Sequence, residues 1–250
     1  NNYYNYINKK LSNKVVKKFI YKKNSPTVEK KRFVDNINKS KIIGVYNLNE
    51  EDLVNSEIIK LNNLIKQTAK NSDLFIVSDY GHGLIGEKTS KILSNQSKFL
   101  SLNAQVNAFN IGYHSLSKYN NINLLIINET ELRHELRDKS SSINILINKI
   151  IKKIKIDNLV ITRGRNGAVY FNKDKNIQIV CPAFASEVVD KVGAGDAMLS
   201  LMSLLCKVKC DPTLSIFLGS LAAAQNVENL NNTNSINKTK LIQFANYMLK

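Results

Sequence analysis

The chain has 250 residues, of which 43% are hydrophobic, and its formal net charge is +16. This length allows one good-sized core with a small appendage. The apolar runs fall short of the roughly 18 residues of a membrane helix, and no secretory leader is visible. Cys181, Cys206 and Cys210 lack the pairing of a metal site, so we expect thiols in a reducing compartment, the cytoplasm.

The positive charge is spread along the chain together with abundant Asn. Only residues 1–32 are both basic and aromatic, so a nucleic-acid binder working through this segment is one hypothesis. A general drift towards Lys and Asn explains the charge better, and the resulting field would steer anionic substrates. We therefore expect neither a nucleic-acid nor a membrane partner.

The first part of the chain predicts a hairpin. Residues 1–25 have little patterning and are expected to be helical or irregular. A strand at 27–34, a polar turn at 35–40 and a strand at 41–46 follow. Helical spacing with acids in the first turn marks 51–70.

Beyond residue 70, short apolar strands alternate with helices. Strands are expected at 74–77, 99–102, 123–127, 159–162, 168–171 and 177–180, and helices at 87–97, 108–119, 142–155, 197–205 and 238–250. This alternation predicts a mostly parallel sheet that is covered on both faces. Ligands of such sheets bind beyond the carboxyl ends of the strands, where Asp79, Asn128 and Thr162 fall.

The glycines at Gly81, Gly83 and Gly86 match a dinucleotide-binding pattern. The acid expected about 20 residues later is missing, and Glu87 stands where a P-loop requires Lys. We interpret these glycines as a strand-to-helix turn near the pocket.

Two polar motifs follow strand ends and remain open from the residues alone. Asn128-x-x-Glu131 fits a helix cap with a capping box, and it also fits a pair that reaches Mg²⁺ through water; both can be true. The loop 162–167 fits a hairpin turn, or a backbone that faces nucleotide phosphates with Arg163 or Arg165.

Residues 190–196 carry the strongest chemical signal. The glycines of Asp190-Lys191-Val192-Gly193-Ala194-Gly195-Asp196 leave main-chain N–H groups uncovered just before an apolar run with helical character. Free N–H groups at a helix start attract phosphate oxygens. A carboxylate beside them suits a base that takes a proton from an attacking hydroxyl. This combination indicates phosphoryl transfer.

The ordered set Asn128-x-x-Glu131, Thr162-x-Gly164-x-x-Gly167 and Asp190-x-x-Gly193-Ala194-Gly195-Asp196 resembles the ribokinase-like (PfkB) carbohydrate kinases. Two further motifs, residues 78–83 and Asn103-Ala104-Gln105-x-Asn107, look like the branch related to D-glycero-β-D-manno-heptose 7-phosphate kinases. The resemblance covers residues 26–250 and implies a three-layer α/β/α sandwich with a small β lid, which the hairpin at 26–46 would form.

The resemblance also implies a chemistry, the transfer of the γ-phosphoryl of ATP to a sugar or sugar phosphate, with heptose 7-phosphate as one acceptor. It makes Asp196 the catalytic base. The other implied site residues are Gly193, Ala194 and Gly195 for the anion hole; Thr162, Gly164, Gly167 and Ser220 for ATP; Asn128 and Glu131 for Mg²⁺ through water; and Asp79 and Asn103 for the acceptor. Lid strands often pair between subunits in this family, so a homodimer through the lid is expected.

The chain departs from the family pattern at three places. Lys191-Val192 replaces the usual Thr pair, and Ser220 stands where an Asn is expected beside adenine. No glycine precedes Gly44, so the family's glycine-rich N-terminal segment is expected to be absent. The alternative hypothesis is therefore a non-catalytic nucleotide- or sugar-binding remnant of such a kinase.

Overall fold

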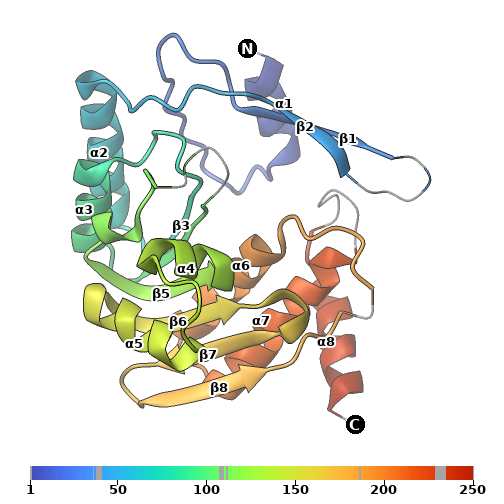
Figure 1. Cartoon of the computed structure of the whole chain (residues 1–250). Coiled ribbons are helices and arrows are strands. Elements are labelled where there is room, and N and C mark those ends of the chain that lie inside the picture. The colour runs from blue at the N-terminus through green and yellow to red at the C-terminus, as the bar shows by residue number, and fades with distance from the viewer. Residues whose placement is uncertain are drawn as a thin grey trace.

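A computed structural model describes residues 2–35, 37, 41–106, 110, 112–185, 187–228 and 235–249. Its centre is a six-stranded sheet in the order β3-β4-β5-β6-β7-β8, with helices on both faces (Figure 1). The strands from β3 to β6 run parallel, and β7 and β8 continue the sheet in antiparallel fashion. The predicted three-layer fold with a mostly parallel sheet is confirmed.

The strands of this sheet lie close to the predicted positions, except that β6 begins at Lys155, which had been assigned to the preceding helix. They are β3 (Phe75–Asp79), β4 (Leu100–Ala104), β5 (Asn121–Asn128), β6 (Lys155–Thr162), β7 (Ala168–Asn172) and β8 (Ile177–Cys181). Because the middle of β5 is buried on both faces, its residues 124–127 are all apolar. Leu125 and Ile127 belong to one core cluster, while Leu124 and Ile126 belong to another. This period of two divides the core into two layers.

Helices complete the two cores. The first cluster takes residues from α2 (Asn55–Ala69), α3 (Glu87–Gln96), α4 (Glu129–Leu136) and α5 (Ile143–Lys153); the second takes them from α6 (Ala194–Lys207) and α7 (Pro212–Val227). A third cluster joins α7 to α8 (Lys238–Met248). None of these described helices is long and apolar enough to cross a bilayer.

The predicted hairpin is also confirmed, as a separate two-stranded antiparallel sheet of β1 (Glu29–Val34) and β2 (Lys41–Asn47). In Figure 1 the hairpin lies together with the N-terminal helix α1 (Asn2–Lys10) at the top of the view, above the large sheet. The polar turn predicted at 35–40 lies largely outside the described residues.

The helix predicted at 108–119 is wrong in its described part. Only a 3₁₀ turn, η1 (Leu116–Lys118), forms there. Gly112 has a φ of +88°, which interrupts a right-handed helix. The side chains at the end of the segment bond instead to Asp79 at the tip of β3, so tertiary contacts override the apolar spacing.

Candidate functional site

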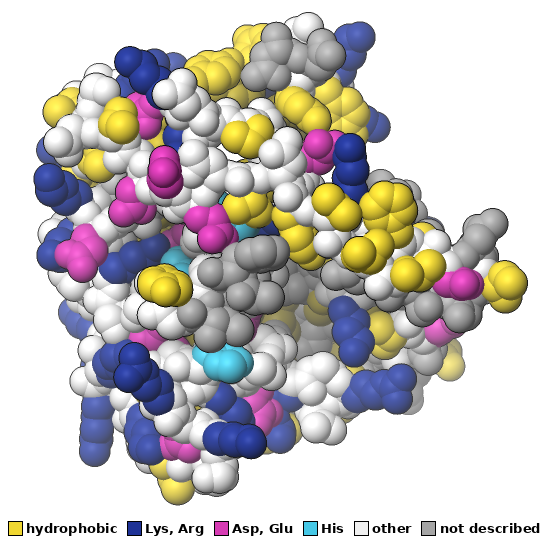
Figure 2. Space-filling model, turned by 45° about the horizontal axis from the view of Figure 1, so that its top comes forward, with side chains coloured by type: hydrophobic (Ala, Val, Ile, Leu, Met, Phe, Trp, Pro, Cys, Tyr) yellow, Lys and Arg dark blue, Asp and Glu magenta, His cyan; other side chains and the backbone are white. Residues whose placement is uncertain are grey.

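A cavity of about 1590 Å³ lies between the hairpin sheet and the carboxyl ends of the parallel strands. Every site residue predicted from the sequence lines it. The volume exceeds the roughly 300–1,000 Å³ of a site for one small ligand, so two substrates can lie side by side. On the face shown in Figure 2, Lys and Arg are scattered, while hydrophobic side chains gather near the hairpin and the N-terminal segment.

Asn128 and Thr162 are directly paired in the parallel register of β5 and β6, so the two predicted strand-end residues lie side by side. Arg163, the next residue, is not among the residues that line the cavity. Its Nε donates to Glu129 at 2.8 Å, and Arg133 donates to the same carboxylate at 2.7 Å. The hydrogen bond from Arg163 is the main reason that the pKa of Glu129 is lowered.

The capping box predicted at the start of α4 is present. Asn128 Oδ1 accepts from the Thr130 amide at 2.8 Å, and Glu131 accepts from the Asn128 amide at 3.0 Å. Burial raises the pKa of Glu131. Among the described residues no group of three His, Cys, Asp or Glu side chains gathers around a metal position. A cation here would therefore depend on water and substrate oxygens, as Mg²⁺ does in nucleotide sites.

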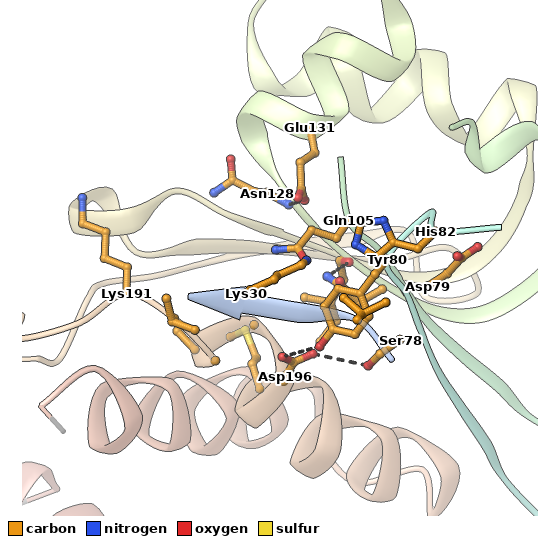
Figure 3. Close-up of a pocket in the computed structure, with 18 of the residues that line it drawn as sticks. Lys30, Ser78, Asp79, Tyr80, His82, Gln105, Asn128, Glu131, Lys191 and Asp196 are labelled. Atoms are coloured by element: carbon orange, nitrogen blue, oxygen red, sulfur yellow. Dashed lines mark hydrogen bonds between the residues drawn. The ribbon is translucent and has the colours of Figure 1, made fainter. Parts of the chain in front are cut away.

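The start of α6 holds Asp196 over the cavity (Figure 3). Gly193 has a φ of +87°, and the Ala197 amide donates to its carbonyl at 2.9 Å. The first four amides of a helix have no acceptor within it, so those of residues 193–196 make no bond within α6 and are open to an outside acceptor. Asp196 accepts hydrogen bonds from Ser78 Oγ at 3.3 Å and from the Tyr80 phenol at 3.1 Å.

Gly195 faces Asn103 across the cavity. A methyl group added at Gly195 would lie 4.0 Å from the amide nitrogen of Asn103, which itself donates to the Ile126 carbonyl at 3.0 Å. The absence of a side chain at Gly195 therefore keeps space open beside Asp196 instead of relieving a clash.

Asp79 has a different environment from the one expected of an acceptor ligand. Its carboxylate is 4% exposed and points away from Asp196 (Figure 3). Its oxygens accept from the Gly81 amide at 3.1 Å and the Tyr119 phenol at 2.8 Å, and they form an ion pair with the Lys118 ammonium at 2.6 Å. A direct contact of Asp79 with the acceptor stays a prediction, and in this structure the carboxylate anchors the turn after β3.

The loop after β6 forms another wall of the cavity. Gly164 and Gly167 both have positive φ, at +57° and +74°. Gly167 packs so tightly that an added Cβ would lie 2.0 Å from the Cys181 carbonyl. Arg165 and Ser220 also line the cavity, the latter from α7. Asn107, from the predicted acceptor-side motif, lies outside the described residues.

Tyr80 and Lys30 are two of the cavity residues that were not identified as site residues from the sequence. Tyr80 follows β3 and, like Ser78, lies on the side opposite to Asp79, so the period of two along a strand was the signal that could have found it. Lys30 comes from β1, and its ammonium lies 5.5 Å from the Tyr80 ring centre and 6.0 Å from that of Tyr46. Burial lowers the pKa of Lys30. Nothing local in the sequence connects this lysine to the cavity.

Comparison with known proteins identifies a family. Residues 16–240 match the family described as pfkB family carbohydrate kinase. Bifunctional protein HldE of Campylobacter curvus is 27% identical over 163 residues, which are 64% of this chain and 34% of that protein. The HldE protein of Koribacter versatilis is 25% identical over 216 residues, 85% of this chain and 43% of that protein. The chain thus spans less than half the length of these curated relatives.

Solved structures show the same fold. Phosphofructokinase-2 from Escherichia coli, in complex with potassium, has a TM-score of 0.67 at 17% identity, covering 83% of this chain and 67% of that one. A ribokinase from Thermotoga maritima has a TM-score of 0.65 at 18% identity, covering 89% and 70%. At these identities the likeness shows that the fold is ribokinase-like.

Proposed function

Because the chain belongs to the pfkB family of carbohydrate kinases, we propose that it transfers the γ-phosphoryl group of ATP to a hydroxyl of a sugar or sugar phosphate. One observation carries this proposal. The start of α6, with Asp196, opens into the same cavity as the strand ends that hold Asn128 and Thr162.

In the proposed reaction, Asp196 accepts the proton of the acceptor hydroxyl as its oxygen attacks the γ-phosphorus. The bond from that phosphorus to the bridging oxygen breaks, and ADP leaves with the electron pair. The amides of Gly193, Ala194 and Gly195 stabilise the charge on the migrating group, because a helix start is positively polarised. Positioning and charge stabilisation are the main requirements of phosphoryl transfer.

ATP is proposed to lie along Thr162, Gly164, Gly167 and Ser220, with its phosphates towards α6. Asn128 and Glu131 would hold the hydration shell of Mg²⁺, which supplies charge neutralisation to the phosphates when it is bound. The oxygen-rich, partly buried pair fits such an outer position. We place the reaction in the cytoplasm, where the free thiols of Cys181, Cys206 and Cys210 stay reduced.

We propose an acceptor that carries its own phosphate, such as heptose 7-phosphate. Lys30 and Arg32 lie two residues apart on β1, and both line the cavity. Because burial disfavours the charged form of Lys30, an anion beside it would restore favourable electrostatics. The Tyr80 ring lies near Lys30, and its phenol contacts Asp196. A sugar that carries a phosphate at one end and the reacting hydroxyl at the other would place the phosphate near Lys30 and the hydroxyl near Asp196.

A homodimer through the hairpin is also proposed. On the face of the hairpin opposite to Lys30 and Arg32, Phe33 pairs with Ile43, and Val45 lies nearby; these side chains are 54%, 55% and 49% exposed. An apolar patch on a two-stranded sheet favours a second copy. Light scattering tests this proposal, since a monomer mass at micromolar concentration would contradict it.

ADP release with a panel of sugars and sugar phosphates tests the function. If the proposal is correct, ADP release should depend on one phosphorylated acceptor. ³¹P NMR should then detect a new phosphate ester. The alternative, a non-catalytic remnant, expects ATP binding with no acceptor-dependent release. A nucleic-acid binder would instead show salt-sensitive binding that survives loss of Asp196.

A further inference from the structure

Each carboxylate oxygen of Asp196 accepts one hydroxyl hydrogen bond from the end of β3. Ser78 donates to Oδ1 at 3.3 Å and Tyr80 donates to Oδ2 at 3.1 Å (Figure 3). From this geometry we propose that Ser78 and Tyr80 are positioning residues that fix the rotation of the Asp196 carboxylate for proton transfer. The inference rests on the proposed function.

Two hydrogen bonds, one to each oxygen, restrict the rotation of the Asp196 carboxylate more than a single bond would. Asp196 lies in the first turn of α6, whereas Ser78 and Tyr80 belong to the tip of β3. A single bond leaves the carboxylate free to rotate, but two bonds from a separate element determine its plane. Each carboxylate oxygen has two lone pairs, so an acceptor site remains on each oxygen for the substrate hydroxyl.

The direction of the two donors follows from the anchoring of Asp79. Because successive strand residues point to opposite sides, the buried bonds of Asp79 to Lys118 and Tyr119 turn Ser78 and Tyr80 towards α6. Asp79, which was predicted to contact the acceptor, thus sets the direction in which the side chains of Ser78 and Tyr80 point.

Tyr80 stays a donor throughout the reaction. Burial, and then the charge and hydrogen bond of Asp196, raise the pKa of Tyr80 to about 12. Two of the charged groups near this side chain are Asp196 from α6 and Lys30 from β1. At neutral pH the phenol therefore keeps its proton and can donate a hydrogen bond to the carboxylate.

A double-mutant cycle on ADP release tests the proposal. Tyr80→Phe is expected to lower kcat about ten- to hundredfold, as for one hydrogen bond to a charged group, with the KM for ATP unchanged. In an Asp196→Asn background the same change should cause no further loss, because its effect acts through the carboxylate. Ser78→Ala should behave likewise, and Ser78→Thr, which keeps the hydroxyl, should restore turnover. Tyr113→Phe, at a side chain that is 92% exposed, is the control.

Equal losses in both backgrounds would overturn the positioning role while leaving the proposed function intact. Unchanged turnover in Asp196→Asn alone would instead remove the base from the proposed function. A second measurement needs no turnover: ¹³C NMR of labelled tyrosine, with the Tyr80 signal assigned by its loss in Tyr80→Phe. Asp196→Asn should lower the pKa of Tyr80, because the neighbouring negative charge is removed. An unchanged pKa would contradict the contact.

Discussion

Lys118 and Asp79 form an ion pair of 2.6 Å beside the cavity, with side chains that are 13% and 4% exposed. The Lys118 ammonium also donates to the Ile85 carbonyl at 2.6 Å. One lysine therefore holds both ends of the glycine turn after β3, the turn that presents Ser78 and Tyr80 to Asp196.

Removing this lysine should destabilise the fold. Lys118→Met leaves the Asp79 carboxylate buried without its cation, and breaking such a buried pair costs about 3–5 kcal/mol. Urea unfolding at neutral pH measures the loss. Lys98→Met is the matched control, because Lys98 and Asp73 form an exposed ion pair of 3.0 Å, and it should change little. Equal urea midpoints for the two variants would show that the buried ion pair does not stabilise the fold.

Two glycines in the cavity should respond differently to alanine. Gly167→Ala places a Cβ against the Cys181 carbonyl at a φ of +74°, so it should destabilise the fold by at least about 1–2 kcal/mol. Gly195→Ala meets only Asn103 at 4.0 Å and should leave the melting temperature unchanged. Because its methyl group projects beside Asp196, it should lower phosphoryl transfer. A stable Gly195→Ala variant with full turnover would contradict the proposed anion hole.

The ion pairs of Glu129 with Arg133 and Arg163 should make the stability of the fold depend on pH in a defined direction. The hydrogen bond from Arg163 is the main cause that lowers the pKa of Glu129 from 4.5. A carboxyl whose folded pKa is lowered contributes stability above its unfolded pKa, and loses it as the pH falls through the folded value. The difference in unfolding free energy between wild type and Glu129→Gln should therefore be present at pH 7 and shrink below about pH 4.5. If the difference in unfolding free energy grew as the pH fell, the pKa of Glu129 would not be lowered in the folded state.

Lys30 should discriminate between phosphorylated and unphosphorylated acceptors. Lys30→Met is expected to raise the KM of a sugar phosphate about tenfold or more, as for a lost charge-assisted hydrogen bond, and to leave an unphosphorylated sugar unaffected. Lys31→Met is the control, because Lys31 lies on the other face of β1 and pairs with Glu29 at 3.4 Å. Equal effects on both acceptors would exclude a phosphate contact at Lys30.

The sequence predicted those parts of the site that follow local rules. Alternating apolar strands and helices predicted the parallel sheet, and parallel strands bring their carboxyl ends to one edge. Asn128 and Thr162 therefore came together as expected. The capping box at Asn128 and Glu131 and the helix start at Gly193 are also local features, encoded within a few residues.

Contacts between distant segments were not predictable in the same way. Asp79 takes its cation from Lys118 and a phenol from Tyr119, within a segment whose spacing had predicted a helix. Lys30 reaches the cavity only because the hairpin folds over the strand ends. Such pairings depend on tertiary structure, which overrides local propensity.

Asp196→Asn should separate ATP binding from turnover, because only turnover requires a base. With a general base worth 10²–10⁴-fold, calorimetry should give an ATP dissociation constant close to that of wild type, while acceptor-dependent ADP release falls by at least about a hundredfold. Release at the wild-type rate in a variant that still binds ATP would contradict the central claim that this carboxylate takes the proton.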